Sequence, residues 1–339
     1  MVSLSLIKKS NATIPDHLPP SLVAIFVGGT SGIGEATLKL FTKSTSKPHI
    51  YIIGRSLSSA ERIIAECRTL NPSGNYEFCQ KDMTSMGDTR RLCDEIRSKE
   101  KVVNLLILSA GDPDLSRTKT SEGLHRLFAA QYYSRILLMT QLLPLLLNAE
   151  SLSRIVNVST GGGSEGAIDT SDMQALTLPM MQLRGHASTM LSLSLNRIAQ
   201  ENPTVAFITQ HPGTVATPAL GRMTGIFGVV IRFLTSILGW AFAVPIDESA
   251  ERHLYLATSS AYPPREGSAK GVPMVGGLEE LHEGVDGEVG SGCYSLGWNG
   301  EGPGRKAVEL LEGYGRDGTG DAVWEHTMGE FERIQREDR

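Results

Sequence analysis

Short apolar runs alternate with longer amphipathic segments through the first two thirds of the chain. The short runs are rich in β-branched residues and predict strands at Val23–Val27, His49–Ile53, Tyr76–Cys79, Leu105–Leu108, Arg154–Val158 and Val205–Thr209. The longer segments predict helices, among them Glu35–Phe41, Ala60–Leu70, Thr89–Lys99, Ser121–Leu147 and Gln182–Asn202. Strands that alternate with helices form βαβ units, so the pattern predicts an α/β fold with a doubly wound parallel sheet. Ligands of such sheets bind beyond the carboxyl ends of the strands.

The pattern changes from about Pro263, where the chain becomes rich in glycine and in charge. Two short helices are predicted beyond it, around Ala307–Leu311 and Ala322–Arg333, and "GCYSLGW" can form one last strand. Residues 1–20 end in a Pro-rich stretch that is typical of an arm. We therefore predict a single domain over residues 21–262, preceded by this arm and followed by a C-terminal extension at residues 263–339.

Composition narrows the functional classes. The 339 residues carry a formal net charge of -5, without the clustered positive charge that binding to nucleic acid requires. The four cysteines lack metal-ligand spacing, which predicts reduced thiols and no metal site. The N-terminus lacks the continuous apolar region of a secretory signal, so we expect a cytoplasmic protein. The oligomeric state stays open, and a homo-oligomer is allowed.

A glycine-rich stretch, "VGGTSGIG", separates the first predicted strand from the first predicted helix. Gly28, Gly32 and Gly34 have the spacing of a turn at which the backbone can approach a pyrophosphate, and the helix N-terminus offers unpaired N–H groups. The alternative is a merely structural tight turn. The strand before the stretch and the helix after it favour a dinucleotide cofactor. The other cofactor-binding residues expected in this turn are Thr30, Ser31 and Ile33.

The end of the second predicted strand bears on the choice between the two nicotinamide dinucleotides. An acidic residue there would accept hydrogen bonds from the adenosine ribose, whereas this chain has Arg55 in "IIGRS". A guanidinium pairs well with a 2′-phosphate, so Arg55 favours NADP over NAD. The alternative is a solvated arginine at a strand end.

Further motifs give the chain a resemblance to the short-chain dehydrogenase/reductase family, with its Rossmann-type fold. "VGGTSGIG" resembles the TGxxxGIG of that family, "LSAG" stands for its NNAG, and "HPGTVAT" resembles its PGxxxT segment beside the nicotinamide. The resemblance covers roughly residues 20–260 and implies further cofactor-binding residues, namely Asp82, Ser109, Ala110, Gly111, Pro212, Gly213, Val215 and Thr217. Several segments, such as "DESAERHLYLAT", look most like those of fungal family members associated with secondary-metabolite pathways.

The catalytic residues that the resemblance implies are largely absent. The family uses a serine at the substrate carbonyl, and "VNVST" offers Ser159 or Thr160, with Thr160 in the better register. The family's tyrosine and lysine are missing, because no tyrosine lies between Tyr133 and Tyr255 and no lysine lies between Lys119 and Lys270. Arg184 and Ser188 fall at the positions of that pair, and Gln131 falls at the position of the family's asparagine.

Several residues are candidates for the missing proton donor. His186 titrates near neutrality, Arg184 can stabilise developing negative charge, and Glu165 lies in an acidic loop with Asp169 and Asp172. Tyr132 or Tyr133 can approach from the neighbouring helix. Each candidate has a structural alternative: a histidine packed within its helix, solvated loop acids, or tyrosines that belong to the core. The identity of the general acid stays open.

A nearly continuous apolar segment, Gly225–Pro245, follows the nicotinamide motif. It is long enough for a membrane span, but Arg232 sits near its centre and three glycines interrupt it. We interpret residues 222–245 as a lid over an apolar substrate, with peripheral membrane contact and a true span as alternatives. The first two readings imply a lipophilic ligand such as a polyketide or terpenoid.

Three functional hypotheses follow. The first is an NADP-dependent oxidoreductase acting on a hydrophobic carbonyl or hydroxyl compound, with a proton donor other than the family tyrosine. The second is a non-redox isomerase or cyclase on the same scaffold, because fold does not determine function. The third is a catalytically silent nucleotide-binding pseudoenzyme. The preserved nucleotide-binding half favours the first.

Overall fold

The computed structural model describes residues 2–112, 117–159, 162–215, 243–274, 276 and 280–337. Within these residues, seven parallel strands form one sheet in the order β3-β2-β1-β4-β5-β6-β7. The strands are β1 Val23–Val27, β2 His49–Gly54, β3 Asn75–Gln80, β4 Leu105–Leu108, β5 Arg154–Val158, β6 Ala206–Gln210 and β7 Cys293–Leu296. The predicted doubly wound parallel sheet is confirmed, including the last strand in "GCYSLGW".

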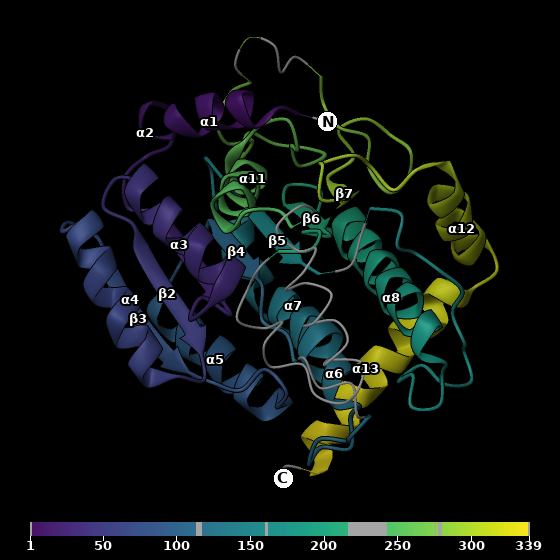
Figure 1. Cartoon of the computed structure of the whole chain (residues 1–339). Helices are drawn as coiled ribbons and strands as arrows, with labels where there is room; N and C mark the ends of the chain where they lie inside the picture. Colours follow the sequence, from purple (N-terminus) through teal and green to yellow (C-terminus); the bar gives the residue numbers. More distant parts are fainter. Residues whose placement is uncertain are drawn as a thin grey trace.

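Helices cover both faces of the sheet (Figure 1). Helices α3, α4 and α11 pack on one face, and α5, α7 and α8 pack on the other. The described helices are α1 Leu4–Ala12, α2 Ile14–His17, α3 Gly32–Ser44, α4 Leu57–Leu70, α5 Met86–Lys99, α6 Arg126–Phe128, the π-helix η1 Ala129–Tyr133, α7 Ser134–Leu147, α8 Met180–Glu201, α11 Ile246–Thr258, α12 Arg305–Arg316 and α13 Thr319–Glu337.

The central strands are buried on both faces, which explains their continuous apolar sequences. Successive side chains of β1 point to opposite faces: Phe26 packs with α3, whereas Val27 belongs to the cluster under α5 and α7. The same alternation runs through β4, where Ile107 and Leu108 belong to different clusters. Two apolar cores therefore cover the two faces of the sheet, and the carboxyl ends of the parallel strands lie along one edge of it.

The N-terminal residues are more ordered than the predicted arm. Helix α1 begins at Ser3, whose hydroxyl accepts a hydrogen bond from the Leu6 amide, and it packs against α11. Ile7 is buried at this contact, and the Asn11 side chain donates to Glu251 O at 2.9 Å and to Glu251 Oε2 at 2.7 Å. A helix this short gains most of its stability from packing its apolar face against α11.

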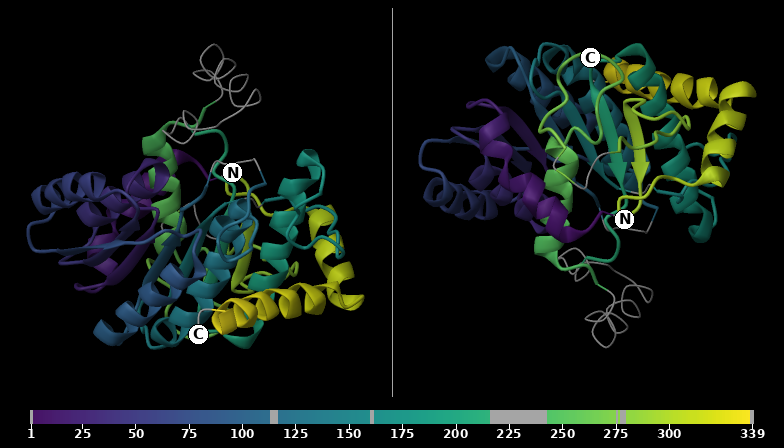
Figure 2. Two further views of the ribbon diagram at one scale, coloured as in Figure 1. Left: turned by 90° about the horizontal axis from the view of Figure 1, so that it is seen from below. Right: turned by 90° about the horizontal axis from the view of Figure 1, so that it is seen from above.

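The C-terminal extension contributes to the core of the domain. Strand β7 pairs with β6 at the sheet edge, and the long helix α13 packs along α8 (Figure 2). Tyr132 Oη lies 2.7 Å from Thr327 Oγ1 of α13, and Arg90 donates to Phe331 O at 2.7 Å. The extension therefore completes the sheet and one apolar core instead of trailing from them.

A buried arginine fastens the C-terminal end of α11 and the segment that follows it to the sheet. Arg154 of β5 is fully buried, and its guanidinium donates to four backbone carbonyls, those of Leu256, Ser259, Tyr262 and Lys270. Burial lowers its pKa to about 10, so it stays charged at neutral pH. Leu256 and Ser259 stand at the C-terminal end of α11, where the helix dipole favours a cation.

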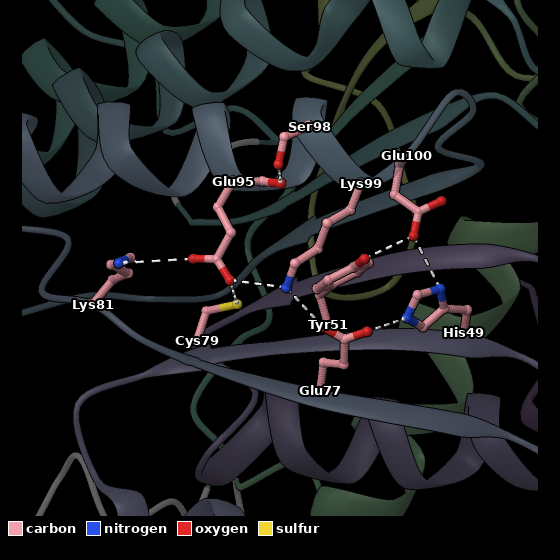
Figure 3. A network of polar contacts seen from close by, with 9 residues as sticks. All are labelled: His49, Tyr51, Glu77, Cys79, Lys81, Glu95, Ser98, Lys99 and Glu100. Carbon is pink, nitrogen blue, oxygen red and sulfur yellow. Dashed lines mark hydrogen bonds and ion pairs between the residues drawn. The ribbon is translucent and has the colours of Figure 1, made fainter.

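A network of polar side chains ties α5 to strands β2 and β3 (Figure 3). His49 lies 3.0 Å from both Glu77 Oε1 and Glu100 Oε1, and Tyr51 Oη donates to Glu100 Oε1 at 2.7 Å. Lys99 bridges Glu77 and Glu95, and Glu95 reaches Lys81 at 3.9 Å. Ion pairs this exposed contribute little individually, but together they join the C-terminal half of α5 to β2 and β3.

We expect stability to fall on acidification because of His253 in α11. Its Nδ1 lies 2.6 Å from Ser249 O, and Nε2 has no partner among the described residues. Protonation would bury an unpaired charge, and burial lowers the pKa to about 4, from an ordinary 6.5. Since the folded-state pKa is depressed, this stability is present above pH 6.5 and lost as the pH falls toward 4.

Urea unfolding between pH 7 and pH 4 measures this effect. His253→Leu should lose less stability than the wild type over that interval, by about 3 kcal/mol at pH 4. Parallel stability curves for the two proteins would show that His253 is not the group responsible.

Candidate functional site

The turn after β1 requires glycine at Gly28, Gly32 and Gly34, either for its backbone conformation or for lack of space. Gly28 has a φ of 90° and Gly32 a φ of 60°, both in the left-handed region. A Cβ on Gly28 would lie 2.5 Å from the Ala110 amide nitrogen, and one on Gly34 would clash with Ser109 Oγ. The turn therefore packs directly against the end of β4 and leaves the first backbone N–H groups of α3 open to a ligand.

A cavity of about 580 Å³ opens at this turn. It lies beyond the carboxyl ends of the strands, on both sides of the point where the sheet order reverses between β1 and β4. Its wall includes six predicted residues of the turn, Gly28, Thr30, Ser31, Gly32, Ile33 and Gly34, and also Ser109, Ala110, Gly111 and Pro212.

The half of the cavity over β2 and β3 holds two basic side chains, Arg55 and Lys81, and carboxylates close to them. Arg55 is half-exposed, and its Nη1 lies 3.8 Å from Asp112 Oδ2. Lys81 and Asp82 line the same half, and Asp82 Oδ1 accepts hydrogen bonds from the Thr84 amide and hydroxyl at 2.9 and 3.0 Å. We call this region the adenosine half, because a cation and an ordered carboxylate fit a phosphorylated ribose and an adenine amine.

The half over β4, β5 and β6 brings together residues from several elements, and we call it the far half. Ser159 and Arg184 both line it, as the sequence predicts. Arg184 donates from Nη2 to Ser164 Oγ at 2.7 Å. Thr160 and Thr217 lie outside the described residues. Gly213 and Val215 are described but do not line the cavity: Gly213 packs on Trp298, and Val215 pairs with Val244.

The structure does not bring His186 or Glu165 to the cavity. His186 is buried, with Nδ1 accepting from the Asp169 amide at 3.2 Å and Nε2 lying 3.1 Å from Met173 O. Glu165 accepts hydrogen bonds from Ser192 Oγ at 3.1 Å and Ser295 Oγ at 2.6 Å. Both hold the loop before α8. Two residues of helix correspond to about 200° of rotation, so Arg184 and His186 face opposite ways.

The two candidate tyrosines are likewise core residues. Tyr132 Oη lies 2.9 Å from Ser194 Oγ, and Tyr133 Oη lies 2.7 Å from His326 Nε2. Burial raises the pKa of Tyr132 to about 12, which is unsuited to proton transfer near neutrality. The α13 helix, which carries His326, was not expected beside them from the sequence.

Sequence reasoning missed two residues of the far half, His211 and Arg135. His211 follows β6 directly, and its pKa is lowered by burial and by the charge of Arg184. Arg135 interrupts the otherwise apolar α7, which is the signal that could have found it. Gln131, which the family resemblance had suggested, also lines the cavity and stands on the π-helix η1. Such widened turns often occur at functional sites.

The arrangement defines the class of protein. A Rossmann-type sheet presents a glycine turn, a basic adenosine half and a far half with a serine hydroxyl. These residues fit a dinucleotide, because the glycines let the turn pack closely against the end of β4, and the start of α3 offers N–H groups to a diphosphate.

Comparison with known proteins assigns the family. The model for short chain dehydrogenase matches residues 22–172. The chain is 36% identical to oxidoreductase andH of Emericella variicolor, over 98% of each chain. It is 27% identical to human polyprenol dehydrogenase, over 71% of this chain and 73% of that one. The structure of L-sorbose reductase from Gluconobacter frateurii, complexed with NADPH and L-sorbose, has the same fold, with a TM-score of 0.54, 17% identity and coverage of 78% of this chain and 100% of that one.

The chain belongs to the short-chain dehydrogenase/reductase family, and it is an enzyme of the oxidoreductase class. This favours the first of the three functional hypotheses over an isomerase or a silent pseudoenzyme. Among the described helices, none is both long enough and apolar enough to cross a membrane. The apolar segment Gly225–Pro245 falls almost entirely outside the described residues.

Proposed function

We propose that this enzyme uses NADP and acts on a hydrophobic carbonyl or hydroxyl compound, of polyketide or terpenoid type, in fungal secondary metabolism. The observation that carries the choice of cofactor is the adenosine half. Arg55 and Lys81 line it, and β2 is followed by arginine where an acidic residue would repel a 2′-phosphate.

The residues of the cavity have separable tasks. The amides at the start of α3 bind the diphosphate, Arg55 pairs with the 2′-phosphate, and Asp82 accepts from the adenine amine. The bound nicotinamide supplies or accepts the hydride. Ser159 orients the oxygen of the substrate, and Arg184 stabilises negative charge that develops on it.

Two observations support a lipophilic substrate. Met180 and Met181 are 42% and 96% exposed at the first turn of α8, one turn before Arg184. This apolar pair does not line the cavity, but one helical turn from Arg184 of its wall it offers contact area to an apolar ligand. The relative polyprenol dehydrogenase is named for a long-chain lipid alcohol.

The cofactor proposal is tested by titration with NADPH and NADH. Wild-type protein should bind NADPH at least about 10-fold more tightly, since a charge-assisted pair contributes about 1.5–3 kcal/mol. Arg55→Asp should reverse this preference, because a carboxylate repels the 2′-phosphate and accepts from the free ribose. Arg68→Asp makes the same charge change at an exposed site on α4 that does not line the cavity, and should leave both affinities unchanged. Equal wild-type affinities for the two nucleotides would refute the use of NADP.

A further inference from the structure

Among the described residues, no carboxylate pairs with the buried charge of Arg135. The residue is only 3% exposed, and its Nη2 donates to Ala110 O at 2.8 Å and Val158 O at 3.1 Å. Its Nε and Nη1 have no hydrogen-bond partner among the described residues. Burial lowers its pKa to about 10, with no opposing carboxylate contribution, so the guanidinium is charged at neutral pH.

Its position relates it to one half of the cofactor. Val158 is the last residue of β5, and Ala110 lies two residues after the end of β4. Both line the far half of the cavity together with Arg135, and so do their neighbours Ser109 and Ser159. A dinucleotide with its diphosphate on the glycine turn and its 2′-phosphate at Arg55 extends in the opposite direction, across β4 and β5. Its nicotinamide half would therefore be held in the part of the cavity that Arg135 lines.

The described charged residues of the far half do not cancel the charge of Arg135. Arg184 is a second cation there, and burial together with Arg184 lowers the pKa of His211, so His211 is neutral at neutral pH. The cavity-wall acid Asp112 is already paired, with Arg126 Nε at 3.0 Å and with Arg55 Nη1 at 3.8 Å. A buried cation with unused donors is unfavourable beside a second positive charge and favourable beside a neutral or negative group. The oxidised nicotinamide ring carries a positive charge, and the reduced ring carries none.

We propose that Arg135 is a positioning residue whose buried charge lies beside the nicotinamide half of the cofactor and makes the site prefer NADPH to NADP⁺. This inference rests on the proposed use of NADP. Such a preference favours the enzyme in the direction of carbonyl reduction, because NADPH binds tightly and NADP⁺ is released readily afterwards.

Binding of three nucleotides tests the proposal without a substrate. Wild-type protein should bind NADPH roughly 10-fold more tightly than NADP⁺, the effect of a unit charge several ångströms away in a partly buried site. Arg135→Met should lower that ratio several-fold, and the part that remains is due to the charge of Arg184, which lines the same half. An unchanged ratio in a folded Arg135→Met protein overturns the proposal. Binding of 2′,5′-ADP, which lacks the nicotinamide half, should stay within about 2-fold of the wild type.

Controls separate this effect from a general loss of structure. Arg90 is the matched control, because it also donates to a backbone carbonyl and its Nη1 has no partner among the described residues. Arg90 does not line the cavity, so Arg90→Met should leave the affinities for all three nucleotides unchanged. A parallel loss of NADPH and 2′,5′-ADP binding in Arg135→Met would indicate a merely structural residue and overturn the proposal. If Arg135→Met does not fold, the wild type alone decides: equal affinity for the two cofactors, or tighter binding of NADP⁺, overturns it. Failure of NADPH to bind the wild type at all refutes the proposed function instead.

Discussion

Gly28→Ala is expected to weaken NADPH binding by roughly 100-fold or more. The added Cβ would lie 2.5 Å from the Ala110 amide nitrogen and 2.8 Å from its Cα, and the φ of 90° is unfavourable for alanine. The turn must move away from β4, which removes at least two charge-assisted hydrogen bonds to the diphosphate, each contributing about 1.5–3 kcal/mol. Fluorescence titration with NADPH measures the loss.

Gly329→Ala is the matched control. No heavy atom lies within 4 Å of the position that its Cβ would take on α13, so NADPH affinity should be unchanged. Removing a glycine from a helix interior should also stabilise the protein by about 0.5–1 kcal/mol. Near-wild-type NADPH affinity in a folded Gly28→Ala protein would show that the cofactor does not bind at this turn.

Arg154→Met is expected to lower the free energy of unfolding by about 3–5 kcal/mol, because several buried carbonyls lose their donor at once. Methionine fills a similar volume but cannot donate to Leu256, Ser259, Tyr262 or Lys270. Replacing a buried ion pair with apolar residues can be neutral, but here only the cation is removed and the acceptors stay buried. Thermal and urea unfolding measure the change.

The exposed Arg305 provides the comparison. Arg305→Met changes the same residue type on the surface of α12, where it pairs with Glu309, and should alter stability by no more than about 0.5 kcal/mol. A similarly small effect of Arg154→Met would mean that water or other donors satisfy the four carbonyls. The prediction that Arg154 fastens the end of α11 and the segment after it would then be wrong.

The strands and the cofactor turn could be predicted from the sequence because both depend on residues close together in the chain. The strands from Val23 to Val158 are short apolar runs that predict their own conformation, and their ends shifted by at most one residue at each terminus. The turn at Gly28 was predictable because backbone conformation alone demands glycine there.

The far half of the cavity was predictable only in part. The segment "VNVST" places Ser159 at a strand end, and the structure puts it on the cavity wall. The sequence could not tell which residues of α8 face the cavity, since the rotation of a helix about its axis relative to the sheet depends on its packing. Arg184 reached the cavity and His186 did not, although only one residue separates them in the sequence.

By itself, the sequence determined the class of fold, the order of its βαβ units and the place of a dinucleotide turn, because each depends on short-range patterns of apolar residues and glycine. The tertiary structure alone decided that the extension adds strand β7 to the sheet, that α13 encloses the two tyrosines, and that Arg135 and His211 face the cavity. These outcomes depend on contacts between residues far apart in the chain, and such contacts form only when the packed elements bring their faces together.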